Sequence, residues 1–176
     1  MARQLIATPP APCRWAKVLD RNGYKAYDES APNEWSIELV LDPKDKDHAA
    51  FMLKAEDLYA EHHGDTRKNS YWLPIREGEK EDTGMNICRF KTKMRAFKDG
   101  NMTKPPTVED TERRPWPEDK LIGNGSVVRV AFEVYAWKAP SGAGLTFQPK
   151  IIQVVEHIPA PSAAGGDADP FSDSPF

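Results

Sequence analysis

The chain has 176 residues, of which 39% are hydrophobic and 29% are charged. These proportions suit one globular domain with a sizeable core and exclude a largely disordered protein. No apolar run is long enough to span a bilayer, and residues 1–13 have one arginine but no apolar stretch of the kind found in secretion signals. We therefore expect a cytoplasmic protein that does not contact membranes.

The net charge of −3 conceals an uneven distribution along the chain. Residues 1–150 contain all 24 lysines and arginines and all but four of the 27 acidic residues. The remaining acidic residues are Glu156, Asp167, Asp169 and Asp173. The sequence is thus a nearly neutral body followed by an acidic end, and this asymmetry says more about partners than the total charge does.

Alternating apolar and polar residues predict strands over residues 13–19, 34–41, 127–137 and 145–158. In the second of these, Trp35, Ile37 and Leu39 fall on one face. The last strand should contain a bulge at Pro149, because proline cannot donate a ladder hydrogen bond.

One amphipathic helix is predicted after the second strand. Asp42 is a suitable N-cap, Pro43 suits the first turn and Gly64 is a natural end. Residues 64–84 and 98–120 are rich in charge, Gly and Pro and are predicted to be loops. This order predicts a mainly β domain with one inserted helix, an arrangement that suits a small barrel.

The most specific signal is NICRFKTKMRAFK, residues 86–98. As a strand, this segment has four cations on one face and an aromatic ring next to them, namely Arg89, Lys91, Lys93, Arg95 and Phe97. Four like charges in a row repel one another unless solvent, counterions or a polyanion lies against them, and a phosphate backbone is the natural polyanion. The alternative is the solvated outer face of an edge strand, where lysines discourage aggregation.

Aromatic side chains favour the first interpretation, in which a polyanion lies against the basic row. In the strand over residues 127–137, Arg129, Tyr135 and Trp137 share an outward face on which a purely structural sheet would carry polar groups. For Trp137, a small core beneath a loop is a serious alternative. A basic groove with exposed rings is typical of single-strand binding, because cations contact phosphates and rings stack on bases.

Residues 121–156 have the order IGNGS, a strand with Tyr135 and Trp137, a Gly-containing turn and a final strand. This segment resembles the closing hairpin of phage replication single-stranded DNA-binding proteins of the T-odd podophage type. The ending DSPF is similar to the acidic, aromatic ends of that family and of bacterial single-strand binders. The detailed likeness covers about the last third of the chain, and the earlier part agrees in layout.

The resemblance implies an OB-fold five-stranded barrel over residues 1–158 and a flexible acidic tail over residues 159–176. It implies a phage-encoded protein that coats single-stranded DNA in replication, recombination or repair, in the cytoplasm of the host bacterium. We expect no catalysis, cofactor or metal. The resemblance also implies a homodimer and contacts with replication proteins such as DNA polymerase, although a tail with only three aspartates leaves tail-mediated dimerisation open.

The tail residues expected to bind partners are Asp167, Asp169, Phe171, Asp173 and Phe176. Their charges can mimic a short stretch of DNA and occupy the basic face, from which real DNA would displace them. The released tail would then offer its last ring and carboxylate to a partner. The alternative is an inert solubilising end, which does not account for the two Pro-Phe pairs.

Two other functions fit parts of the sequence. Glu118 and Lys120 are an acid and lysine pair of the kind that Mg²⁺-dependent nucleases use, but they follow two prolines in a predicted loop. An OB-like protein adaptor would need a mostly apolar exposed patch rather than a basic row. Neither the histidines nor Cys13 and Cys88 have metal-ligand spacing, and reduced, partly buried thiols are expected.

Overall fold

The computed structural model describes residues 5–26, 28, 30–64 and 71–160, so the five partner-binding residues of the predicted tail lie outside the described residues. The strands are β1 (Ile6–Ala7), β2 (Ala11–Lys17), β3 (Glu34–Leu41), β4 (Tyr71–Trp72), β5 (Ile75–Glu77), β6 (Asn86–Lys93), β7 (Thr107–Asp110), β8 (Val127–Ala139) and β9 (Gly142–Glu156). The helices are α1 (Lys46–His63) and the short 3-10 helix η1 (Lys80–Asp82). In this part of the chain, neither helix is long and apolar enough to cross a membrane.

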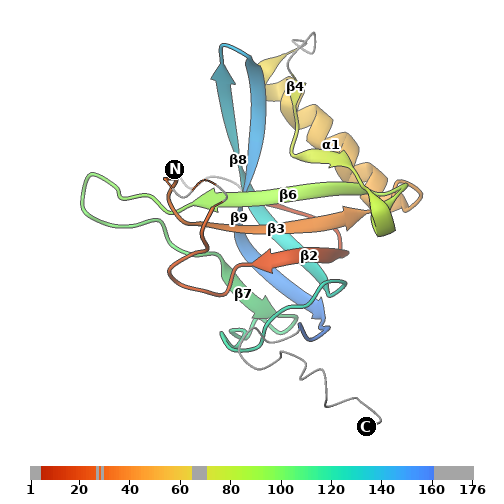
Figure 1. Cartoon of the computed structure of the whole chain (residues 1–176). Coiled ribbons are helices and arrows are strands. Elements are labelled where there is room, and N and C mark those ends of the chain that lie inside the picture. The colour runs from red at the N-terminus through yellow and green to blue at the C-terminus, as the bar shows by residue number, and fades with distance from the viewer. Residues whose placement is uncertain (1–4, 27, 29, 65–70, 161–176) are drawn as a thin grey trace.

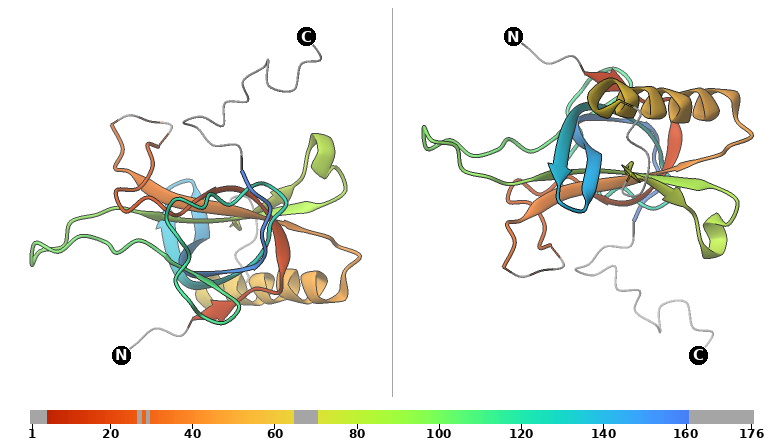
Figure 2. Two further views of the ribbon diagram at one scale, coloured as in Figure 1. Left: turned by 90° about the horizontal axis from the view of Figure 1, so that it is seen from below. Right: turned by 90° about the horizontal axis from the view of Figure 1, so that it is seen from above.

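Five strands close a barrel in the order β2, β3, β6, β9 and β8, because β8 pairs with both β9 and β2. The pairings are antiparallel except for β6 with β9, where Phe90 lies opposite Phe147 in a parallel register. Figure 2 shows this ring end-on, with α1 along its side. A five-stranded barrel of this kind is the OB fold, so the predicted fold class is confirmed.

Alternation along the strands determines the core. Trp35 and Ile37 of β3 are fully buried, as their pattern predicted. Inside the barrel, Phe90, Phe132 and Phe147 from three different strands meet with ring centroids 4.4 to 5.9 Å apart. Aromatic pairs at such separations contribute about 0.5–1.5 kcal/mol each beyond the area they bury, which ties β6, β8 and β9 together.

The helix begins later than predicted. Asp45, rather than Asp42, is the N-cap, and its side chain accepts hydrogen bonds from two N–H groups of the first turn. The Asp42 carboxylate instead accepts the N–H of Lys44 at 2.9 Å, in the turn before the helix. Gly64 ends the helix with φ 64°, as predicted. The buried face of α1 packs on the barrel, where Phe51 contacts the Phe132 ring edge-on.

Both segments predicted to be loops contain short strands, so that prediction was wrong in part. β4 and β5 lie within residues 64–84, and β7, within residues 98–120, pairs in parallel with β9. Conversely, β6 ends at Lys93, so Arg95 and Phe97 lie beyond the strand. The short strands are too brief to show an alternation of their own, and β4 and β7 form only through pairing with β9, far away in the sequence.

The ends of β8 and β9 extend beyond the barrel as a two-stranded arm, formed by residues 135–139 and 142–146 and visible at the top of Figure 1. We call it the β8–β9 arm. Two side chains from the end of α1 hold its backbone: the Tyr59 hydroxyl donates to Ala143 O at 3.3 Å, and His63 Nε2 to Gly144 O at 2.9 Å. β4 pairs with the same segment of β9.

Candidate nucleic-acid interface

A groove with a volume of about 560 Å³ lies between β6 and the outer faces of β8 and β9. Its lining residues are Lys91, Thr92, Lys93, Arg95, Phe97, Thr103, Glu133, Tyr135, Thr146, Gln148 and Lys150. Five of the eight residues predicted to bind nucleic acid are therefore brought together here. Four cations and one carboxylate give the lining a formal charge of +3. We call it the basic groove.

Strand β6 supplies Lys91 and Lys93, whose side chains alternate with the buried side chains of Phe90 and Thr92. Lys91 is itself half-buried. Burial lowers the pKa of the Lys91 ammonium, Glu34 opposes this shift, and the neighbouring charges of Arg89 and Lys93 add to it. The charged form of Lys91 is thus less favourable here than in water, and an anion in the groove would stabilise it.

Arg89, the first cation of the predicted row, does not line the groove. Its Nη2 lies 3.4 Å from Glu34 Oε1 on the adjacent strand β3. Nearby on β3, Glu38 accepts a hydrogen bond from Arg76 Nη1 at 2.8 Å. Glu34 therefore partly compensates Arg89, and the cations that line the groove are Lys91, Lys93, Arg95 and Lys150.

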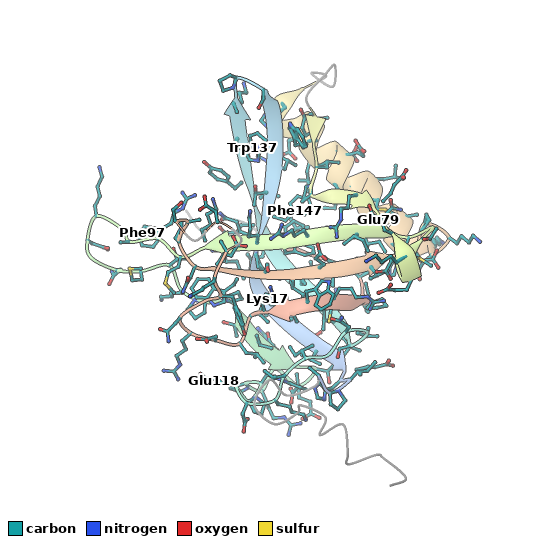
Figure 3. The ribbon with its side chains drawn as sticks, viewed as in Figure 1. Lys17, Glu79, Phe97, Glu118, Trp137 and Phe147 are labelled. Atoms are coloured by element: carbon teal, nitrogen blue, oxygen red, sulfur yellow. The ribbon has the colours of Figure 1, made fainter. Side chains whose placement is uncertain are left out.

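Arg95 and Phe97 belong to an irregular hairpin, residues 95–103, which extends from the barrel at the left of Figure 1. The Thr103 N–H donates to Arg95 O at 2.8 Å, and the Arg95 N–H donates to Thr103 Oγ1 at 2.9 Å. The Phe97 N–H donates to Asn101 O at 2.7 Å. These bonds hold Phe97, labelled in Figure 3, at the mouth of the groove with 56% of its surface exposed.

The groove continues along this hairpin. A second hollow of about 730 Å³ shares Phe97 and Lys150 with the first and extends to Lys104 and Thr107. Together the two hollows form an extended surface rather than a closed pocket. This shape suits a linear ligand more than a compact one.

Lys150 was not predicted as a site residue. The β8–β9 register shifts between Ala131 and Phe132, which face Ile151 and Pro149, so Lys150 is the extra residue of a bulge. Bulges re-aim side chains, and this one turns Lys150 into the groove. The sequence signal was present, because the bulge lies beside Pro149 as predicted.

The three predicted residues of β8 have different surroundings. Tyr135 lines the groove and is 45% exposed. Trp137 lies further out on the β8–β9 arm and is half-buried, and it does not line the groove. Arg129 is exposed but also outside the groove, and its Nε donates to Thr8 O at 3.0 Å. The groove therefore contains Tyr135 but neither of the other two.

The residues of the nuclease alternative have separate partners. Arg21 Nε donates to Glu118 Oε1 at 2.9 Å, whereas Lys120 Nζ lies 4.7 Å from the centre of the Trp116 ring. Both lie outside the strands. Among the described residues, no three His, Cys, Asp or Glu side chains are grouped so that they could hold a metal ion.

Both cysteines are buried free thiols. Burial raises the pKa of Cys13 to about 11 and that of Cys88 well above its usual value. Because the thiolate is the reactive form, these side chains are inert parts of the core. The sequence predicted partly buried thiols, and both are completely buried.

No protein-family model and no curated protein matches the chain. Solved structures do share its fold. gp2.5, a single-stranded DNA binding protein encoded by bacteriophage T7, is 17% identical, with a TM-score of 0.66 over 99% of this chain and 98% of that one. The single-stranded DNA-binding protein from bacteriophage Enc34 in complex with ssDNA is 13% identical, with a TM-score of 0.66 over 89% and 88%. The chain thus has the fold of these phage proteins, as the resemblance implied.

Proposed function

We propose that this protein binds single-stranded DNA in the basic groove without sequence preference. The observation that carries the proposal is a groove of formal charge +3 with exposed rings, Phe97 and Tyr135, on an OB barrel. Cations that neutralise phosphates release condensed counterions, and any base can stack on a ring. A protein of the same fold solved with ssDNA supports the assignment.

The roles within the groove follow from side-chain chemistry. The phosphate contacts are Lys91, Lys93, Arg95 and Lys150. The stacking platforms are Phe97 and Tyr135. Arg89 and Arg129 act through the electrostatic field rather than by direct contact, because each already has a partner within the protein.

In this function the protein coats and protects single strands during phage DNA replication, recombination or repair, in the cytoplasm of the host bacterium. It has no catalytic step. Labelled single-stranded DNA incubated with the protein and Mg²⁺ should therefore stay intact. Cleavage that is lost in Glu118→Gln would support the nuclease instead.

The deciding measurement is the affinity for single-stranded and for double-stranded DNA at two salt concentrations. Single strands should bind more tightly at both, because only unpaired bases offer their faces to Phe97 and Tyr135. Affinity should fall as salt rises. Equal affinity for both forms of DNA, or no binding to either, would refute the proposal.

The acidic tail is the second part of the proposal. Its aspartates compete weakly with DNA for the basic groove, and its Pro-Phe pairs bind replication proteins such as a DNA polymerase. Removing residues 167–176 should tighten DNA binding, most visibly at low salt, and abolish recovery of those partners. Sedimentation of the same variant tests self-association through the tail. Unchanged DNA binding together with unchanged partner recovery would rule out a role for the tail.

A further inference from the structure

The face of the β8–β9 arm that carries Tyr135 continues beyond the basic groove. Tyr135 pairs with Thr146, and two residues further along Trp137 pairs with Gly144. Alternate residues of a strand share a face, and the bulge of β9 lies outside the arm, so the two rings point to the same side. Figure 3 shows Trp137 on the arm, away from the barrel.

A third aromatic residue completes a row across three strands. β4 pairs in parallel with β9, and Trp72 lies opposite Gly144. A Cβ placed on Gly144 would clash with the Trp137 ring and would lie 2.8 Å from Trp72 Cβ. The two tryptophans therefore flank the same glycine on one face. Trp72 is 54% exposed, whereas Trp137 is half-buried.

The backbone beneath this row is held in place. His63 Nε2 bonds to the carbonyl of Gly144 itself, and the Tyr59 hydroxyl bonds to the carbonyl of Ala143. An indole on a fixed backbone loses little conformational entropy when a ligand stacks on it. Trp72 stands on β4, which pairs with this held segment of β9, and an exposed tryptophan in that position is suited to binding a flat, apolar surface such as a nucleobase.

We propose that Trp72 is a base-stacking site at the far end of the single-strand path, which runs from the basic groove over Tyr135 and Trp137 to β4. This inference rests on the proposed function. Two residue steps along a strand and two strand spacings across the sheet put Trp72 about 12 Å from Tyr135. Single-stranded DNA confined to the basic groove would not reach Trp72. Stacking of a base on this neutral ring adds no phosphate contact.

The test compares two oligothymidylates, of about four and about sixteen nucleotides, which bracket the site sizes of OB folds. Trp72→Leu keeps an apolar side chain over the row but removes the ring. It should lower affinity for the long oligonucleotide by about 5- to 140-fold and leave the short one unchanged. The slope of log affinity against log salt concentration should not change, because the substitution removes no cation. Trp72→Phe should retain most of the affinity.

Trp15→Leu is the matched control. Trp15 is 62% exposed, but it lies in a different hollow, with Glu38 and Asp82 among the lining residues. This variant should bind both oligonucleotides like the unaltered protein.

Two outcomes would overturn the inference and leave the proposed function standing. Trp72→Leu could lose no affinity for either oligonucleotide, or it could lose affinity equally for both. Failure of the unaltered protein to bind either length would overturn the proposed function as well. If Trp72→Leu does not fold, ¹⁹F NMR of 5-fluorotryptophan-labelled protein decides, with the Trp72 signal assigned through Trp72→Phe. That signal should shift with the long oligonucleotide only, and an unmoved signal would contradict the proposal.

Discussion

The indole of Trp137 lies over the backbone of Gly144, its partner across the β8–β9 arm. No side chain larger than hydrogen fits at residue 144 unless the ring moves. The backbone of Gly144 does not adopt a positive φ, so glycine is needed here for close approach rather than for an unusual conformation. This contact also explains why Trp137 is half-buried although it stands on the outward face of its strand.

Gly144→Ala should therefore destabilise the protein by roughly 1–3 kcal/mol, the usual cost of forcing a methyl group into filled space. In a Trp137→Ala background the same change should cost less, because the contact with the Trp137 ring is gone and only the contact with Trp72 Cβ remains. Thermal melting of the two single variants and the double variant gives the coupling energy. Strictly additive losses would mean that the ring does not rest on the glycine in solution.

The lysines of the basic groove make a prediction about salt. Each phosphate contact on a single strand contributes about −0.7 to the slope of log affinity against log salt. The double variant Lys91→Ala/Lys93→Ala should therefore flatten the slope by about 1.4. Lys44→Ala/Lys54→Ala removes the same charge from exposed positions outside the groove and should leave the slope almost unchanged. If affinity falls in the groove variant while its slope stays constant, these lysines do not contact phosphates.

Local patterns predicted the parts of the fold that are themselves local. The alternation in β3 and β6 identified both the core face and the outward cations Lys91 and Lys93, because a strand repeats every two residues wherever it lies. The helix start was predicted at Asp42, three residues too early. Asp42 is of a residue type that caps helices, but its carboxylate accepts the Lys44 N–H in the turn before the helix, and Asp45 is the N-cap instead.

Features that depend on long-range pairing were not predictable. Thr107–Asp110 has no pattern of its own and becomes strand β7 only because β9 offers an edge. Trp72 belongs to a segment whose composition indicates a loop, and only its pairing with Gly144 puts it next to Trp137. Lys150 enters the groove through a bulge, and the sequence showed the proline beside it but not the direction of the lysine.

The exposed rings of the groove give a test of stacking. Phe97→Ala and Tyr135→Ala should each cost on the order of 1–3 kcal/mol of binding to single-stranded DNA. Tyr135→Phe should bind almost normally, because the ring face is kept. Both side chains are about half exposed, so the alanine variants should melt close to the unaltered protein. Fluorescence anisotropy with a labelled oligonucleotide measures the affinities, and Leu53→Ala, an exposed apolar position on α1, is the control. Identical losses in Tyr135→Phe and Tyr135→Ala would argue for a hydroxyl contact instead of stacking.

The lowered pKa of Lys91 predicts how DNA binding and folding depend on pH. In the free protein, burial lowers this pKa below its ordinary value of 10.5, whereas a bound phosphate favours the charged form and raises it. Affinity should therefore be constant near neutral pH and decline as the pH rises through the lowered pKa, where binding must take up a proton. For folding stability the sign is opposite. Charged Lys91 is less favourable in the folded than in the unfolded protein, so it lowers the free energy of unfolding at pH values below its lowered pKa. This destabilisation is relieved as the pH rises toward 10.5.

Lys91→Arg separates this effect from other alkaline changes, because arginine stays charged throughout the range. Affinity for an oligodeoxyadenylate, whose bases do not titrate there, is measured at constant ionic strength from about pH 7 to about pH 10. The arginine variant should hold its affinity to higher pH than the unaltered protein, whereas Lys54→Arg on α1 should change nothing. If affinity depends on pH in the same way in all three proteins, the charge of Lys91, as burial in the groove controls it, does not contribute to phosphate binding.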